Sequence, residues 1–267
     1  MKIIIFLKSI FVEKKYNKKY INILIRAFNI SLLLIIFYFV FYISFKKQNF
    51  VFNWEAIFKY RAKFFIGIKN TILISFISLI LSIFIGFIFA IAQESKVYII
   101  KYFAKFYVTI IRGTPFLVQI LIFFYIIADA INLKDRYLSG IIILSIFSGA
   151  YITEIIRGGI LSISKAQQEA MNAIGFTKFQ KYFYIIIPQI IKIILPGLIG
   201  QLASLIKDSS LLSIISISEF TLNAQEVNSF TFSTFEAYIP LAIGYFILTG
   251  IVNIFGKWIE KKFLFEH

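Results

Sequence analysis

Residues 168–189 read QEAMNAIGFTKFQKYFYIIIPQ, and this stretch interrupts a chain that is apolar on both sides of it. Ser164, with a glutamine three residues later, is typical of a capped helix start. Gly175 stands where the end of a helix favours a left-handed residue. A second amphipathic helix is expected from near Thr177 up to Pro188. We therefore expect a helix, a glycine turn and a second helix, joined at both ends to longer apolar segments.

The composition indicates that the chain lies in a membrane. Apolar residues make up 60% of the 267 residues, charged residues only 15%, and the mean hydropathy is +0.86, whereas about a quarter of the residues in soluble domains are charged. The absence of cysteine excludes disulfide scaffolds and cysteine metal sites. The one histidine, His267, leaves little for a zinc site or a catalytic triad. We therefore expect neither a metal site nor enzyme activity.

Six stretches are apolar over about 20 residues, the length that a helix needs to cross a bilayer. They are residues 27–45, 67–92, 114–132, 138–155, 188–206 and 236–256. A chain with this many apolar stretches and so few charges between them is expected to fold as an all-α, multi-pass transmembrane helical bundle.

The distribution of basic residues predicts the orientation. If both termini are cytoplasmic, most of the 28 lysines and arginines fall on the cytoplasmic side, where such residues are enriched. The basic stretch between Lys46 and Lys69 is a local exception. Residues 157–187 are then cytoplasmic, and residues 1–26 form a basic segment that anionic lipids would attract. These segments account for the net charge of +15, so we expect no nucleic-acid partner.

Polar residues inside the spans have two interpretations. The second span repeats small residues at helical spacing, which allows helix backbones to pack closely, and the third span contains a glutamine. The same groups could instead line a solute path, and spacing alone leaves both interpretations open. These candidate pathway or packing residues are Thr71, Ser75, Ser78, Ser82 and Gln119.

Three further groups are expected to have structural roles. Glu154 and Arg157 lie one helical turn apart, so we expect a local ion pair. Lys207 and Asp208 end the fifth span and could also pair. The third group forms the turn into the third span, where a glycine permits a tight bend and a proline suits a first helical turn. Its residues are Arg112, Gly113, Thr114 and Pro115.

The interrupting stretch resembles the EAA loop of ABC-importer permeases. That signature reads Glu-Ala-Ala, three residues, Gly, nine residues, Ile, one residue, Leu and Pro, and the same spacing runs here from Glu169 to Pro188. Ile187 replaces the leucine. Met171 replaces the second alanine, and its larger side chain could tune the choice of partner. Further stretches resemble the polar amino-acid uptake subfamily, in the same order: NTILISFISLILSIFIGFIFAIAQES (70–95), IIRGTPFLVQI (110–120), AYITEIIRGGI (150–160) and SLIKDSSLLSIISISE (204–219).

The resemblance implies a type I ABC importer permease with a five-helix core over residues 65–262. Residues 27–45 would add one N-terminal transmembrane helix to that core. The cytoplasmic segment 157–187 would then be the coupling loop that contacts an ATPase. The coupling residues implied are Ser164, Ala166, Glu169, Ala170, Met171, Ala173, Gly175 and Pro188.

The partners and function implied are those of the family. Two ATP-binding subunits, a second permease subunit (identical or homologous) and an external binding protein would together import a polar amino acid across a bacterial inner membrane. This chain has no Gly-x4-Gly-Lys-Ser/Thr loop, so ATP and magnesium would belong to the partners and the chain itself has no cofactor. Lys207 and Asp208 could then shape an outer gate. The alternative is a stand-alone channel or ion-coupled carrier, in which residues 165–175 would have no partner. The choice of amino acid stays open.

Overall fold

The computed structural model describes residues 19–48 and 52–264, and none of these residues forms a strand. The chain divides into two units, residues 1–52 and 53–267, which are described separately. The expected basic segment 1–26 lies mostly outside the described residues, and its bounds stay a prediction.

The first unit contains helix α2 (Lys19–Gln48), in which Ile25–Ile43 is apolar enough to cross a membrane. None of its apolar window is buried within the chain, and Phe37 stacks on Phe41 one turn along its surface. An exposed apolar helix suits lipid, because its backbone groups are bonded within the helix itself. The additional N-terminal span expected from the sequence is therefore present as a helix.

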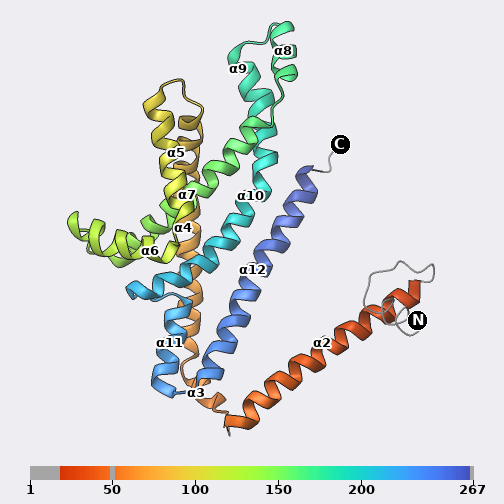
Figure 1. The fold of residues 1–267 in the computed structure, drawn as a ribbon, viewed down its shortest axis with the longest axis vertical. Coiled ribbons are helices and arrows are strands. Elements are labelled where there is room, and N and C mark those ends of the chain that lie inside the picture. The colour runs from red at the N-terminus through yellow and green to blue at the C-terminus, as the bar shows by residue number, and fades with distance from the viewer. Residues whose placement is uncertain (1–18, 49–51, 265–267) are drawn as a thin grey trace, which may run out of the picture. The chain divides into compact units, whose positions relative to one another are not determined.

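The second unit is a bundle of long helices joined by shorter helical segments (Figure 1). Its long helices are α4 (Arg61–Gln93), α7 (Arg136–Leu161), α10 (Ile187–Asp208) and α12 (Thr234–Leu264). The remaining α-helices are α3 (Trp54–Lys59), α5 (Tyr98–Gly113), α6 (Phe116–Ile122), α8 (Lys165–Ala173), α9 (Lys178–Gln180) and α11 (Phe220–Thr231). Two π-helical segments, η1 (Phe123–Ala128) and η2 (Lys181–Ile186), and the 3₁₀ segment η3 (Ser209–Ile215) complete it.

The third span differs from the sequence expectation. Instead of one helix over residues 114–132, α5 and the α6–η1 pair form two apolar segments bent by 111°. The lysines on α5 make its sequence resemble a surface loop, so α5 is not among the spans expected from the sequence. The bend follows from Thr114 and Pro115, which both have extended backbone conformations and stop α5 before α6 begins.

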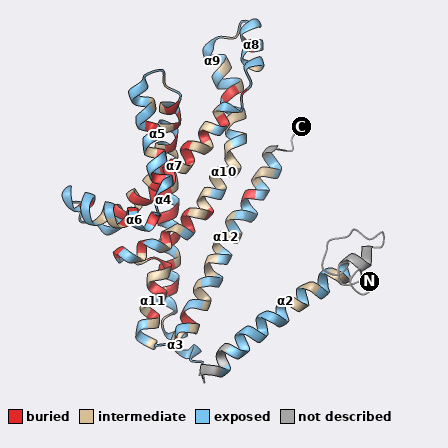
Figure 2. Cartoon of the chain, in the orientation of Figure 1, coloured by how far each residue is buried: buried red, intermediate tan, exposed pale blue. Residues whose placement is uncertain are grey.

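Buried residues gather on α4 and α7 and on the adjoining parts of α5, α6 and α11 (Figure 2). The small residues predicted on the second span make the close packing of α4 possible. A Cβ atom added to Gly86 would lie 2.5 Å from the Ile152 side chain of α7, and one added to Gly67 would lie 2.8 Å from the Phe220 Cα of α11. Only glycine fits at these two crossings.

Replacing Gly67 with alanine should lower the stability of the detergent-solubilised protein by about 1–3 kcal/mol, because the added methyl group meets backbone rather than a movable side chain. The matched control is Gly250→Ala in α12, where an added Cβ meets nothing within 4 Å. That change should be neutral or slightly stabilising, since alanine favours helix. Thermal melting of both variants measures the difference, and equal melting temperatures would contradict the close crossing at Gly67.

Candidate functional site

The segment between α7 and α10 folds into the predicted helix, glycine turn and second helix. The Ser164 hydroxyl accepts a hydrogen bond from the backbone N–H of Gln167 (3.2 Å) and so caps α8. Gly175 follows α8 with φ of +77°, a left-handed conformation that costs other residues about 1–2 kcal/mol. The predicted helix start and glycine turn are confirmed.

The second helix begins with a capping box that the sequence analysis did not identify. The backbone N–H of Gln180 donates to the Thr177 hydroxyl (3.3 Å), and the N–H of Thr177 donates to the Gln180 side chain (2.9 Å). A threonine followed three residues later by glutamine was the available signal. At Ser164 only half of such a box forms, because the Gln167 side chain donates to Gln189 (3.1 Å) rather than back to the Ser164 backbone.

Met171 anchors α8 to the rest of the chain. Its side chain is 3% exposed and packs with Ile163 and Ile186. Met171 therefore faces its own chain rather than the exposed surface of α8, and its expected influence on the choice of partner stays a prediction. The rest of α8 is exposed apart from the partly buried Gln167. The exposed residues are Ala166, Glu169, Ala170 and Ala173, together with the longer polar Lys165, Gln168 and Asn172.

Further contacts join α8 to the helix that follows. Lys181 of η2 donates to the Asn172 side chain at the end of α8. The exposed rings of Phe179 and Phe183 stack with their centroids 5.2 Å apart. The π-helical turn of η2 leads into Pro188, which has no N–H to continue the α-helical bonding pattern. The two short helices are thus tied together as one exposed knob at the end of the bundle (Figure 1).

A charged network joins α4, α5 and α7 near the end from which α7 leads into α8. The Glu154 carboxylate lies 3.8 Å from both Arg112 and Arg157 and accepts a hydrogen bond from the Gln93 side chain (3.1 Å). Arg157 also pairs with Glu94 at 3.0 Å. The predicted Glu154–Arg157 pair is confirmed, but it is one part of a larger network. Each ion pair is partly exposed and contributes little to stability alone. The structural role of the network is that it links three helices.

Gln119 stabilises the bend between α5 and α6. Its side chain is buried, and its amide donates to the Ile111 carbonyl (2.7 Å), the Thr114 hydroxyl (2.8 Å) and the Thr114 carbonyl (3.1 Å). Two of these acceptors, the Ile111 and Thr114 carbonyls, are backbone groups that the break at Thr114 leaves without helical partners. The Gln119 amide is therefore bonded to the backbone and side chain of the bend in which it lies. A role for Gln119 on a solute path stays a prediction.

The small hydroxyl residues of α4 are fully buried against neighbouring helices. Ser82 donates to the Ser78 carbonyl (2.6 Å) and the Ser145 carbonyl of α7 (3.1 Å). The Thr71 hydroxyl accepts from the backbone N–H of Phe220 (3.1 Å). The Ser75 hydroxyl has no hydrogen-bond partner among the described residues. These contacts favour the packing interpretation within one chain, and the pathway role stays a prediction.

The polar cluster at the start of α11 was missed by the sequence analysis. The fully buried Glu219 carboxylate caps α11, accepting from the N–H groups of Leu222 (2.7 Å) and Thr221 (2.8 Å) and from the Tyr245 hydroxyl (2.9 Å). Burial raises the pKa of Glu219 to about 7, against the opposing effect of these donors. The signal in the sequence was a carboxylate directly before an apolar helical pattern.

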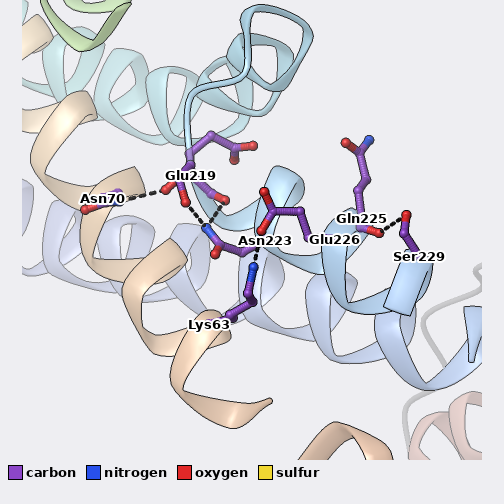
Figure 3. Close-up of polar contacts among 8 residues, drawn as sticks. Lys63, Asn70, Glu219, Asn223, Gln225, Glu226 and Ser229 are labelled. Carbon is purple, nitrogen blue, oxygen red and sulfur yellow. Dashed lines mark hydrogen bonds and ion pairs between the residues drawn. The ribbon is translucent and has the colours of Figure 1, made fainter. Parts of the chain in front are cut away.

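Neighbouring polar contacts hold α11 against α4 (Figure 3). The Asn70 amide of α4 donates to the Ser218 carbonyl (2.7 Å), and the Asn223 amide donates to the Ser218 hydroxyl (2.9 Å). One turn before Gly67, Lys63 pairs with Glu226. By contrast, the possible ion pair between Lys207 and Asp208 does not form within the described residues.

Comparison with known proteins decides the family. Residues 82–264 match the family described as "Binding-protein-dependent transport system inner membrane component". The chain belongs to this family. It is 37% identical over 199 residues to the "Putative glutamine transport system permease protein GlnP" of Rickettsia typhi, covering 74% of this chain and 91% of that protein. It is 32% identical over 213 residues to the "Glutamine transport system permease protein GlnP" of Escherichia coli K12, covering 79% and 97%.

Solved structures agree with this family. The chain superposes on the "amino acid ABC transporter with histidines" with a TM-score of 0.74 and 32% identity, over 80% of this chain and all of that one. It superposes on the inward-facing MetNI methionine ABC transporter with a TM-score of 0.63 and 16% identity, over 74% and 94%, which shows a shared fold.

Family membership establishes the general role of the chain. It is the multi-pass inner-membrane permease subunit of an ABC importer, works with ATPase partners and a binding protein, and is not itself an enzyme. ATP is bound by the partner ATPase, so the permease needs no cofactor.

The raised pKa of Glu219 predicts a pH-dependent stability. A carboxyl whose pKa rises on folding, here from 4.5 to about 7, binds more protons in the folded state. Its contribution to stability is therefore present at low pH and lost as pH rises through about 7, amounting to about 3 kcal/mol. We expect melting temperatures to fall less steeply between about pH 5 and pH 8 in Glu219→Gln than in the wild type. The exposed control Glu55→Gln should keep the wild-type slope, and an unchanged slope in Glu219→Gln would contradict the assignment.

Proposed function

We propose that this permease imports glutamine, or a polar amino acid close to it, delivered by an external binding protein. We choose glutamine because the chain is similar, over most of its length, to permeases named for glutamine in Rickettsia typhi and Escherichia coli. The similarity to the solved amino acid ABC transporter with histidines supports the broader proposal that the cargo is a polar amino acid.

We propose that the α8–α9 knob docks into a cleft of the ATPase. Its exposed residues include three alanines around Glu169, and a helix with small side chains on its surface can lie in a groove. The knob is anchored by Met171 and by the Lys181–Asn172 bond, so a push on α8 would be transmitted to η2 and α10. The coupling residues predicted from the sequence keep this role as a proposal.

The proposed assembly contains two permease subunits, identical or homologous, and two ATPases. Both termini would lie on the cytoplasmic side with the knob, in agreement with the distribution of lysine and arginine. The binding protein would dock at the opposite end of the second unit, where α11 and α3 lie (Figure 1). The core would span residues 65–262, with residues 27–45 as an added helix.

Reversing the charge of Glu169 should release the ATPase. We expect Glu169→Lys to insert normally but to reduce both ATPase co-purification and ATP-driven uptake at least about tenfold, because a charged-residue contact in a docked interface is worth upwards of 1.4 kcal/mol. The control Asp129→Lys makes the same charge change on an exposed carboxylate after η1 and should retain the ATPase. Uptake that needs no ATPase would instead favour a channel or an ion-coupled carrier.

The cargo is tested with the importer reconstituted in proteoliposomes together with its ATPase and binding protein. Glutamine-loaded binding protein should stimulate ATP hydrolysis and accumulate labelled glutamine inside, while equal concentrations of leucine should do neither. Stimulation by glutamate or histidine, with no response to glutamine, would reject glutamine as the cargo while leaving the ATPase docking of α8 intact.

A further inference from the structure

Two adjoining hollows lie along α5, at the end of the bundle that carries α8. The first is polar, has a volume of about 330 Å³ and includes Lys105, Arg112, Arg157 and Glu154 in its lining. The second is an open, shallow apolar hollow on one face of α5, lined only by side chains of that helix, most of them aromatic or aliphatic. Lys105 and Thr109 line both hollows, so the two form one continuous surface with a polar and an apolar half.

The polar half has an excess of positive charge. Three basic side chains line it, against the single carboxylate of Glu154. That carboxylate already lies beside Arg112 and Arg157, and Arg157 is further paired with Glu94. Lys105 is exposed and makes no hydrogen bond or ion pair with another described residue. Helix α5 itself contains no acidic residue. The ammonium group of Lys105 is thus available to an anion from outside the chain.

The apolar half is suited to a hydrocarbon chain. Tyr102, Phe103 and Phe106 line it, and each of these side chains is more than 60% exposed in the chain. These rings are exposed on one helix of the bent α5 and α6–η1 pair, which is apolar enough to cross a membrane, so a hydrocarbon chain is a fitting occupant. A free phosphate ion would satisfy Lys105 but leave this half uncovered, whereas an uncharged lipid would cover it and leave Lys105 without a counter-ion.

We propose that the two hollows together bind one anionic phospholipid from the leaflet on the α8 side. Its phosphate lies against Lys105 at the edge of the polar half, and an acyl chain follows Tyr102, Phe103 and Phe106. Charge complementarity selects an anionic headgroup. The bound lipid would sit beside the Glu154 network and hold α5 against α7 at the base of the coupling knob.

The test measures lipid bound to the complete importer, permease with its ATPase, by native mass spectrometry in an uncharged detergent. Phosphatidylglycerol and phosphatidylcholine with identical acyl chains are the two probes. We expect phosphatidylglycerol to bind more tightly, and Lys105→Gln to weaken its binding about fivefold, the effect of one basic residue near an anionic lipid. The matched control is Lys101→Gln, one turn earlier on α5 and outside both hollows, which should bind as the wild type does.

A second variant tests the junction between the hollows. Thr109→Trp places a large ring at an exposed position shared by both halves and should also weaken phosphatidylglycerol binding. Equal binding of the two lipids to the wild type would reject charge selection. Equal losses in Lys101→Gln and Lys105→Gln would show a diffuse basic surface and overturn the site. Full displacement of phosphatidylglycerol by millimolar inorganic phosphate would assign the polar half to a soluble anion instead.

Discussion

The close packing of α4 against α7 and α11 is the contact on which the rest of the second unit depends. In lipid, apolar side chains gain little by moving from hydrocarbon to protein, so helices associate through close backbone approach and hydrogen bonds. Gly67 and Gly86 provide that approach, and the fully buried Thr71 and Ser82 provide bonds across it. Large residues at these positions would separate the helices that carry both the α11 cluster and the charged network.

Much of the architecture could be predicted from the sequence, because long apolar stretches in a charge-poor chain have few alternatives to helix. The start of α8 and its glycine turn could be predicted for a local reason, since Ser164 and Gly175 act on their own neighbouring backbone. What the sequence did not show is α5. The sequence pattern of α5, lysines among aromatic and aliphatic residues, did not reveal a helix, and only the fold shows that its buried residues pack against α7.

The missed and misread site residues are those whose partners lie far away in the chain. Glu154 was expected to pair only with its helical neighbour, yet it also meets Arg112 and Gln93 from two other helices. Glu219 gave a weak local signal, and its burial depends on Tyr245 from α12. Met171 looked like part of an outward surface because its position in the motif usually holds alanine, and only the fold shows that it faces Ile163.

Two kinds of contact meet at the base of the coupling knob: a buried apolar anchor and a partly exposed network of ion pairs. The two differ in how easily they break and re-form. On one side, the buried Met171 joins α8 to η2 and the start of α10 by packing against Ile186 and Ile190, and the exposed Lys181–Asn172 bond adds a second link to η2. On the other side, α7 meets α5 through the Glu154 network, whose pairs are partly exposed and separated by up to 3.8 Å. Buried side chains such as Val108 and the hydrogen bond from the Tyr107 hydroxyl to the Ile146 carbonyl (2.6 Å) hold the same two helices together. Water-exposed ion pairs exchange at low cost, whereas a buried anchor does not. A displacement of the knob by the ATPase would therefore carry α10 with it, and the partly exposed pairs of the Glu154 network are the contacts that would exchange at the lowest cost.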